Sequence, residues 1–212
     1  MNHLGFLKAF AGSGGEWVIY LLIAASVWSV AVIIERFWVI TRQRRLAEAW
    51  EKKFVEILRA SSRKEALARL QPHTVDSGSA ASRMAKELLD QGSHGSLSRD
   101  QQIEVRLGIE KRYLEKRLLI LGTLGNNAPF VGLLGTVLGV IRAFHDLAST
   151  AGGPEIVMQG LSEALIATAV GIVVAIPCVA SYNYLRKRTK DLLSDLDHLG
   201  KRVIALVEGS GE

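Results

Sequence analysis

The stretch LLILGTLGNNAPFVGLLGTVLGVI, residues 118–141, has no charged side chain in twenty-four positions. A helix of this length can cross the roughly 30 Å hydrocarbon core of a bilayer. Residues 164–185 form a second charge-free stretch of twenty-two, and both stretches are rich in small residues that let membrane helices pack closely. A pair of buried soluble helices would need a larger surrounding core than the rest of the chain supplies. Both stretches therefore predict membrane-spanning helices.

A third apolar stretch lies near the N-terminus. Residues 18–34 hold seventeen uncharged side chains, and the apolar run resumes at residues 37–40 after Glu35 and Arg36. A signal peptide is the alternative, but no small-residue cleavage site follows and the run leads directly into basic residues. We expect a membrane helix whose Glu35 and Arg36 extend to the lipid headgroups.

The basic residues indicate the orientation. The 212 residues carry a formal charge of +5, and of 26 Lys and Arg, 17 lie in residues 42–117 and six in residues 186–212. The positive-inside rule places both segments in the cytoplasm and the N-terminus in the periplasm. No groove-reading or stacking motif accompanies the charge, so nucleic-acid binding is not expected.

These patterns predict an all-α integral membrane protein with three transmembrane helices, the second and third extended into the cytoplasm, and a helical cytoplasmic loop domain. The helix carrying the second span is expected to run from about Gln101 to Leu147, about 70 Å. The predicted segments are periplasmic 1–16, transmembrane 17–41, cytoplasmic 42–117, transmembrane 118–144, periplasmic 145–158, transmembrane 159–185 and a cytoplasmic C-terminal helix 186–212.

The C-terminal segment carries an apolar stripe at heptad-like spacing. Its members are Leu192, Leu196, Leu199, Val203 and Leu206. Such a stripe packs either against the chain's own cytoplasmic helices or against another subunit, and its length does not separate the two.

The second and third spans each carry a stripe of small residues with a single threonine on it. Thr136 and Thr168 both lie within about 7–11 Å of the outer boundary, so they can occupy one layer of the membrane. Two interpretations stay open, plain helix packing and a polar lining for an ion or a partner helix. The predicted packing seam contains Gly132, Gly139, Ala164, Gly171 and Ala175.

Glu163 is the one carboxylate near this seam. At this depth it is either a functional group or simply a first-turn residue that reaches water. No nucleophile–base pair occurs, and the glycine-rich stretch lacks the lysine of a phosphate-binding loop, so we predict neither an enzyme nor a cofactor. Five scattered His and one Cys predict no metal site.

Three motifs together resemble the MotA/TolQ/ExbB proton-channel family. They are APFVGLLGTVLG at 128–139, LSEALIATAVG at 161–171 and AIP at 175–177. Glu35-Arg36 and Tyr182-Asn183 fit the same pattern, and the resemblance covers all three spans in order and orientation. With three spans in total the chain is closer to ExbB and TolQ than to flagellar stators, which have an additional pair.

The resemblance implies a homopentamer in the bacterial inner membrane that couples the proton motive force to a TonB/TolA-like periplasm-spanning protein. It also implies an ExbD/TolR-like single-span partner, whose intramembrane Asp carries the proton. Thr136, Thr168 and Glu163 would then line the proton pathway. The ExbB, TolQ and gliding-motility subfamilies and sodium coupling stay open, as does a non-conducting membrane scaffold.

Overall fold

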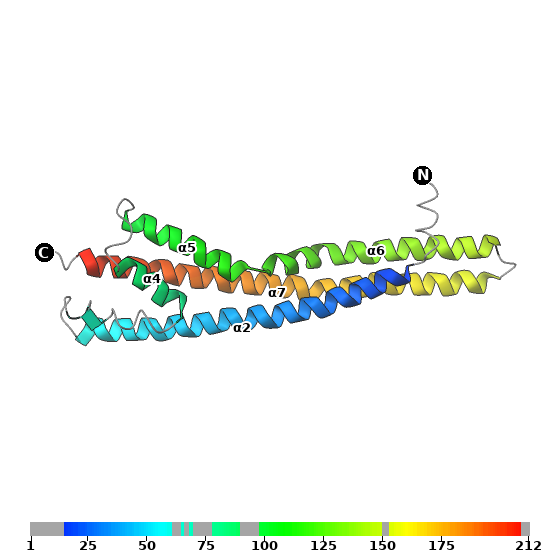
Figure 1. Cartoon of the computed structure of the whole chain (residues 1–212). Helices are drawn as coiled ribbons and strands as arrows, with labels where there is room; N and C mark the ends of the chain where they lie inside the picture. Colours follow the sequence, from blue (N-terminus) through cyan, green and yellow to red (C-terminus); the bar gives the residue numbers. More distant parts are fainter. Residues whose placement is uncertain are drawn as a thin grey trace. The chain divides into compact units, whose positions relative to one another are not determined.

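The computed structural model describes residues 15–60, 65, 68–69, 78–89, 98–149 and 153–208, and within these residues every regular element is a helix. The helices in Figure 1 are α2 (Glu16–Ala60), α4 (Ala80–Leu89), α5 (Arg99–Glu115), α6 (Leu118–Ser149) and α7 (Pro154–Glu208). Three of them, α2, α6 and α7, are long and apolar enough to cross a membrane. The predicted all-α membrane class with three spans is therefore confirmed.

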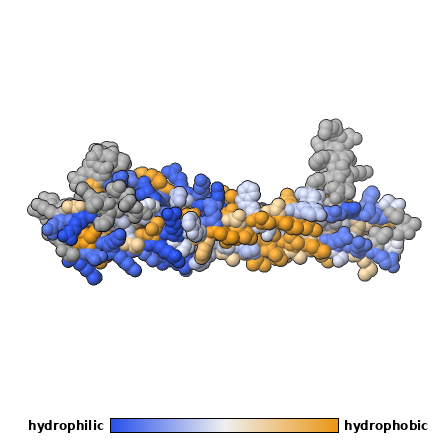
Figure 2. All heavy atoms as spheres, turned by 60° about the horizontal axis from the view of Figure 1, so that its bottom comes forward, coloured by the Kyte–Doolittle hydropathy of each residue, from blue (hydrophilic) through white to orange (hydrophobic). Residues whose placement is uncertain are grey.

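The chain divides into two compact units. The first contains the chain up to Ile34 together with Arg117–Tyr184, and the second contains Glu35–Lys116 together with the chain from Leu185 onward. Large apolar side chains such as Trp28, Phe130 and Val173 are exposed on the first unit, where Figure 2 shows a hydrophobic surface. An exposed apolar surface of this kind suits contact with lipid or with other membrane helices.

The core of the first unit joins the beginning of α2 to α6 and α7. Its buried members are Val18, Leu22, Ala128, Leu138, Val174, Ala175 and Cys178. Several of these are small because α6 and α7 approach too closely for large side chains, as the glycine contacts below show. The predicted seam residue Ala175 lies in this core, 5% exposed.

The apolar stripe of the C-terminal segment is buried in the second unit. Leu192, Leu196 and Val203 are each at most 1% exposed, and a side chain at Gly200 would meet Ile103 of α5 at 3.0 Å. Of the two interpretations left open, packing against the chain's own helices of the second unit therefore describes this stripe. The third span continues into it without interruption, because α7 is one helix of 55 residues.

Hydrogen-bonding side chains fix the starts of the two short helices of the second unit. Ser98 and Gln101 form a capping box at the start of α5, each side chain bonding the other's backbone. At α4 the Gln43 side chain of α2 accepts a 3.1 Å hydrogen bond from the backbone N–H of Ala80. Because Gln43 is itself buried, this bond anchors α4 to α2.

The expected continuous helix from Gln101 to Leu147 is interrupted. α5 ends at Glu115, α6 begins at Leu118, and Arg117 between them has a φ of 66°. That left-handed conformation breaks the helical hydrogen-bond pattern and is uncommon for a residue with a side chain. The new helix begins with a bond from the Ile120 N–H to the Arg117 carbonyl, 3.1 Å. By contrast, α2 continues without a break through its basic residues to Ala60.

The expectation that Arg36 extends to the lipid headgroups is wrong. The residue is 5% exposed, its Nη2 lies 2.6 Å from the Glu35 carboxylate, and its Nη1 donates to the Tyr113 carbonyl at 3.4 Å. Arg36 thus turns inward and links α2 to the end of α5. An arginine next to an apolar span is as well satisfied by a protein carbonyl as by lipid, and sequence position alone does not distinguish these environments.

Candidate functional site in the first unit

Glycines bring α6 and α7 into backbone contact. A Cβ atom at Gly132 would lie 2.7 Å from the Ala167 carbonyl oxygen, and one at Gly171 would lie 2.7 Å from the Ala128 carbonyl oxygen. At Gly139 it would lie 2.7 Å from the Cβ of Ala164. These separations are shorter than van der Waals contact, so the two helices pack this closely only because the side chains are absent.

The two threonines meet at this close approach. The Thr136 and Thr168 hydroxyls are hydrogen-bonded to each other, although 32 residues separate them in the chain. Thr136 Oγ1 also lies 3.3 Å from the Gly132 carbonyl oxygen of its own helix and 3.3 Å from the Ala164 carbonyl oxygen of α7. The pair is partly buried, at the level where Gly132 faces Thr168.

The hydrogen bond between the two hydroxyls can run in either direction. A hydroxyl has one hydrogen and two acceptor lone pairs, so Thr136 donates to only one of its three neighbouring oxygens at a time. When it donates to a carbonyl, Thr168 donates to Thr136; when it donates to Thr168, the Thr168 hydrogen is free to point elsewhere. Rotation of the two hydroxyls therefore changes which threonine is the donor and which is the acceptor.

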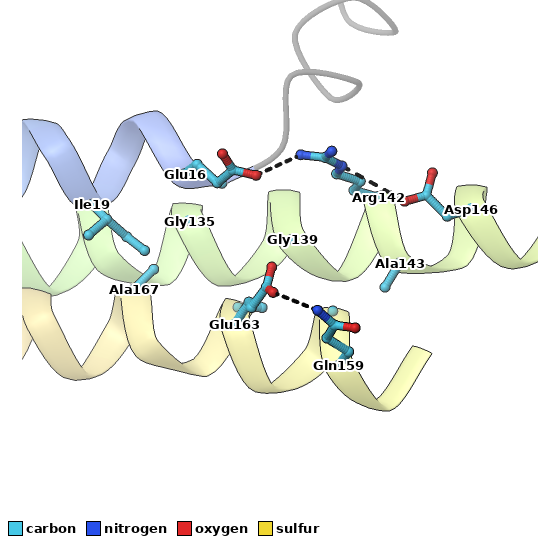
Figure 3. A pocket seen from close by; sticks show the side chains of 13 residues that line it. Glu16, Ile19, Gly135, Gly139, Arg142, Ala143, Asp146, Gln159, Glu163 and Ala167 are labelled. Carbon is cyan, nitrogen blue, oxygen red and sulfur yellow. Dashed lines mark hydrogen bonds and ion pairs between the residues drawn. The ribbon is translucent and has the colours of Figure 1, made fainter. Parts of the chain in front are cut away.

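The hydrogen bonds of the threonines do not include Glu163 among the residues that the structure describes. The Glu163 side chain is exposed, and its carboxylate accepts a 3.2 Å hydrogen bond from Gln159 Nε2 one turn earlier in α7. It lines a pocket of about 240 Å³ between the start of α2, the end of α6 and the beginning of α7 (Figure 3). The pocket reaches the level of the threonines, because Ala164, whose carbonyl faces Thr136, also lines it.

Three charged residues of this pocket, Glu16, Arg142 and Asp146, were not among the sequence candidates. Glu16 at the start of α2 and Arg142 near the end of α6 form an ion pair of 3.0 Å across 126 residues of chain. The sequence did contain a signal, since Arg142 is the only Lys or Arg between Arg117 and Arg186. A lone basic residue at the end of an apolar span is commonly paired with a carboxylate.

No metal centre is evident at this site. Among the residues that the structure describes, no group of three His, Cys, Asp or Glu side chains lies close enough together to hold an ion. What the site offers instead is a pair of exchangeable hydroxyls below a pocket with ionisable side chains.

Known proteins resemble the chain over this region. The sequence model of the MotA/TolQ/ExbB proton channel family matches residues 74–198. The biopolymer transport protein ExbB of Aquifex aeolicus is 36% identical over 130 residues, which are 52% of this chain and 88% of that protein. The Tol-Pal system protein TolQ of Haemophilus influenzae is 31% identical over 202 residues, which are 91% of this chain and 89% of that protein.

A Helicobacter pylori protein named putative biopolymer transport protein ExbB-like 2 is 35% identical over 132 residues, 53% of this chain and 88% of that protein. The family match includes Thr136, Thr168 and Glu163, together with all of α6. Similarity to both ExbB and TolQ over most of their lengths supports the family and leaves the two subfamilies open.

Proposed function

Because the chain belongs to the MotA/TolQ/ExbB proton channel family, we propose that it is a proton-channel subunit of an inner-membrane energy-transducing complex. In this proposal a single-span partner of the ExbD/TolR type supplies an intramembrane aspartate, and a TonB/TolA-like protein receives the work across the periplasm. The subunit itself forms a homo-oligomer, a pentamer by analogy with the family.

The observation that carries the proposal is the hydrogen-bonded pair of Thr136 and Thr168. The apolar stretch 164–185 contains no carboxylate of its own, so a proton that crosses this layer needs hydroxyls here and an acid from elsewhere. We assign the two threonines and Glu163 to the proton pathway, with Glu163 at its outer end. The seam residues Gly132, Gly139, Ala164, Gly171 and Ala175 hold the helices at the separation that the pair requires.

The proposed arrangement in the membrane keeps the segments given above, 17–41, 118–144 and 159–185, with the N-terminus periplasmic and the C-terminus cytoplasmic. Protons then enter at the pocket beside Glu163 and leave toward the basic cytoplasmic residues. Each proton that moves down the membrane potential releases about 2.3 kcal/mol per 100 mV, so a few protons per step supply several kcal/mol of work.

Removing either hydroxyl tests the proposal. Thr136→Val and Thr168→Val keep the shape of the side chain and delete the exchangeable proton, so each is expected to reduce activity at least about tenfold. Thr168→Ser keeps the hydroxyl and is expected to retain most activity. The measurement is rescue of the envelope phenotype of a deletion strain, with its sensitivity to a protonophore and with assembly scored on native gels.

The control is Thr123→Val, which removes an exposed hydroxyl from the same helix. If both valine variants of the pair assemble and keep full activity, the threonines are not on the proton pathway. That result would favour a non-conducting scaffold. One observation already suits a scaffold, because the Thr136 hydroxyl has hydrogen-bond partners within the chain and needs no ion.

A further inference from the structure

The pocket beside Glu163 is lined by four ionisable side chains from three helices (Figure 3). Glu16 comes from α2, Arg142 and Asp146 from α6, and Glu163 from α7. Three carboxylates and one guanidinium therefore share one cavity of about 240 Å³. A single guanidinium cannot neutralise three carboxylates, so which of them it binds decides which one stays free.

The guanidinium is held on the side of the pocket away from Glu163. Arg142 Nη1 lies 3.0 Å from Glu16 Oε1, and its Nε lies 3.8 Å from Asp146 Oδ2. In Figure 3 these two contacts lie along α2 and α6, and the Glu163 side chain stands on α7. Asp146 lies one turn beyond Arg142, which is the favourable spacing for an ion pair on a helix.

Glu163 has a neutral partner. Among the residues that the structure describes, its carboxylate bonds only to the Gln159 side chain, at 3.2 Å. Of the three carboxylates that line the pocket, Glu163 is the one held by a neutral amide, whereas Glu16 and Asp146 lie beside the guanidinium.

The position of Glu16 is fixed by backbone packing. A Cβ atom at Gly15 would lie 2.5 Å from the Gly135 carbonyl oxygen, so the start of α2 is pressed directly onto α6. Val18 meets the same glycine, where an added Cβ would lie 3.1 Å from its Cγ1. The backbone of α2 therefore brings Glu16 to the part of α6 that carries Arg142, and their ion pair itself is partly exposed.

We propose that Arg142 is a positioning residue, which Glu16 and Asp146 hold away from Glu163 so that Glu163 stays unpaired and able to exchange protons. The inference rests on the proposed function, since it concerns how protons reach the threonine pair. Without the two acidic partners, the nearest remaining carboxylate in the same pocket is Glu163. An Arg142–Glu163 ion pair would then compete with proton uptake at Glu163.

Carbodiimide labelling tests this directly. A water-soluble carbodiimide reacts with the protonated form of a carboxyl group that solvent reaches, as at Glu163, and mass spectrometry of the peptide containing residue 163 measures the rate. In the assembled complex, Glu16→Gln with Asp146→Asn is expected to slow labelling of Glu163 by about two- to fivefold, the range that a partly exposed ion pair supplies. Adding Arg142→Gln is expected to restore the rate of the unmodified chain.

The matched control is Glu155→Gln, which removes an exposed carboxylate from the start of α7 that does not line the pocket. An unchanged labelling rate in the double variant, or no recovery in the triple variant, would overturn the proposal. So would the absence of labelling at Glu163 in the unmodified chain.

The test is separable from that of the proposed function. If the labelling rates follow the expected order while Thr136→Val and Thr168→Val stay active, the role of Arg142 stands and the proton pathway through the threonines fails. If the threonine variants are inactive while labelling is unaffected by the double variant, the pathway stands and the role of Arg142 fails.

Discussion

Replacing Gly132 with alanine is expected to destabilise the assembled protein by about 1–3 kcal/mol, the range for overpacking a well-packed interior. The added Cβ would lie 2.7 Å from the Ala167 carbonyl oxygen and 3.0 Å from the Thr168 Cα, and both are backbone atoms that cannot rotate away. To relieve the contact, α6 and α7 must separate. Because Thr168 is one of the residues displaced, the hydrogen bond to Thr136 weakens as well.

The control for this prediction is Gly108→Ala in α5, where a Cβ would meet nothing within 4 Å. There the substitution removes only the conformational cost of glycine in a helix and is expected to stabilise by up to about 1 kcal/mol. Thermal unfolding of the detergent-purified protein measures both. Similar shifts for the two variants would show that the close contact at Gly132 contributes nothing.

The second large loss of stability is expected on replacing Glu110, which joins α5 to α4. This carboxylate is 2% exposed, accepts two hydrogen bonds from Arg83, at 2.8 Å and 2.7 Å, and accepts one from Arg106 at 2.8 Å. The hydrogen bond to Glu110 is the main cause that raises the pKa of Arg83. Removing the carboxylate takes this rise away, but an arginine stays charged at neutral pH even without it.

Glu110→Ala is expected to cost about 3 kcal/mol, because it leaves two arginines without their shared partner. This is the lower end of the range for a buried pair, since the Arg83 side chain is 35% exposed and water replaces part of the interaction. Glu48→Ala removes the carboxylate of an exposed pair on α2, Arg44–Glu48, and is expected to cost no more than about 0.5 kcal/mol. Equal losses in unfolding temperature would contradict this assignment.

The membrane helices were predictable because composition alone determines them. Charge-free runs of seventeen, twenty-four and twenty-two residues have few stable alternatives to a membrane helix, and these three runs lie in α2, α6 and α7. The packing seam of α6 and α7 was also predictable, because small residues at spacings of three and four lie on one helix face. Comparing depths from the outer boundary then placed Thr136 and Thr168 in one layer, and the structure brings their hydroxyls into contact.

The differences arise where distant parts of the chain decide the local structure. The break at Arg117 lies in the sequence EKRLL, which contains no glycine or proline to mark it. Arg36 turns inward toward a carbonyl 77 residues away, and Arg142 finds its partner 126 residues away at Glu16. Periodicity within one helix carries no information about such partners, so the Glu16–Arg142 ion pair could not be assigned from the sequence.

The central claim is that protons cross the seam through the Thr136–Thr168 pair. The most direct measurement is proton uptake by liposomes that contain the complex purified through a tag on this chain, with a pH-sensitive dye inside and a potassium diffusion potential across the membrane. We predict that Thr168→Val reduces the potential-driven proton flux at least about tenfold, and that Thr168→Ser retains most of it. Undiminished flux through a correctly assembled Thr168→Val complex would contradict the account.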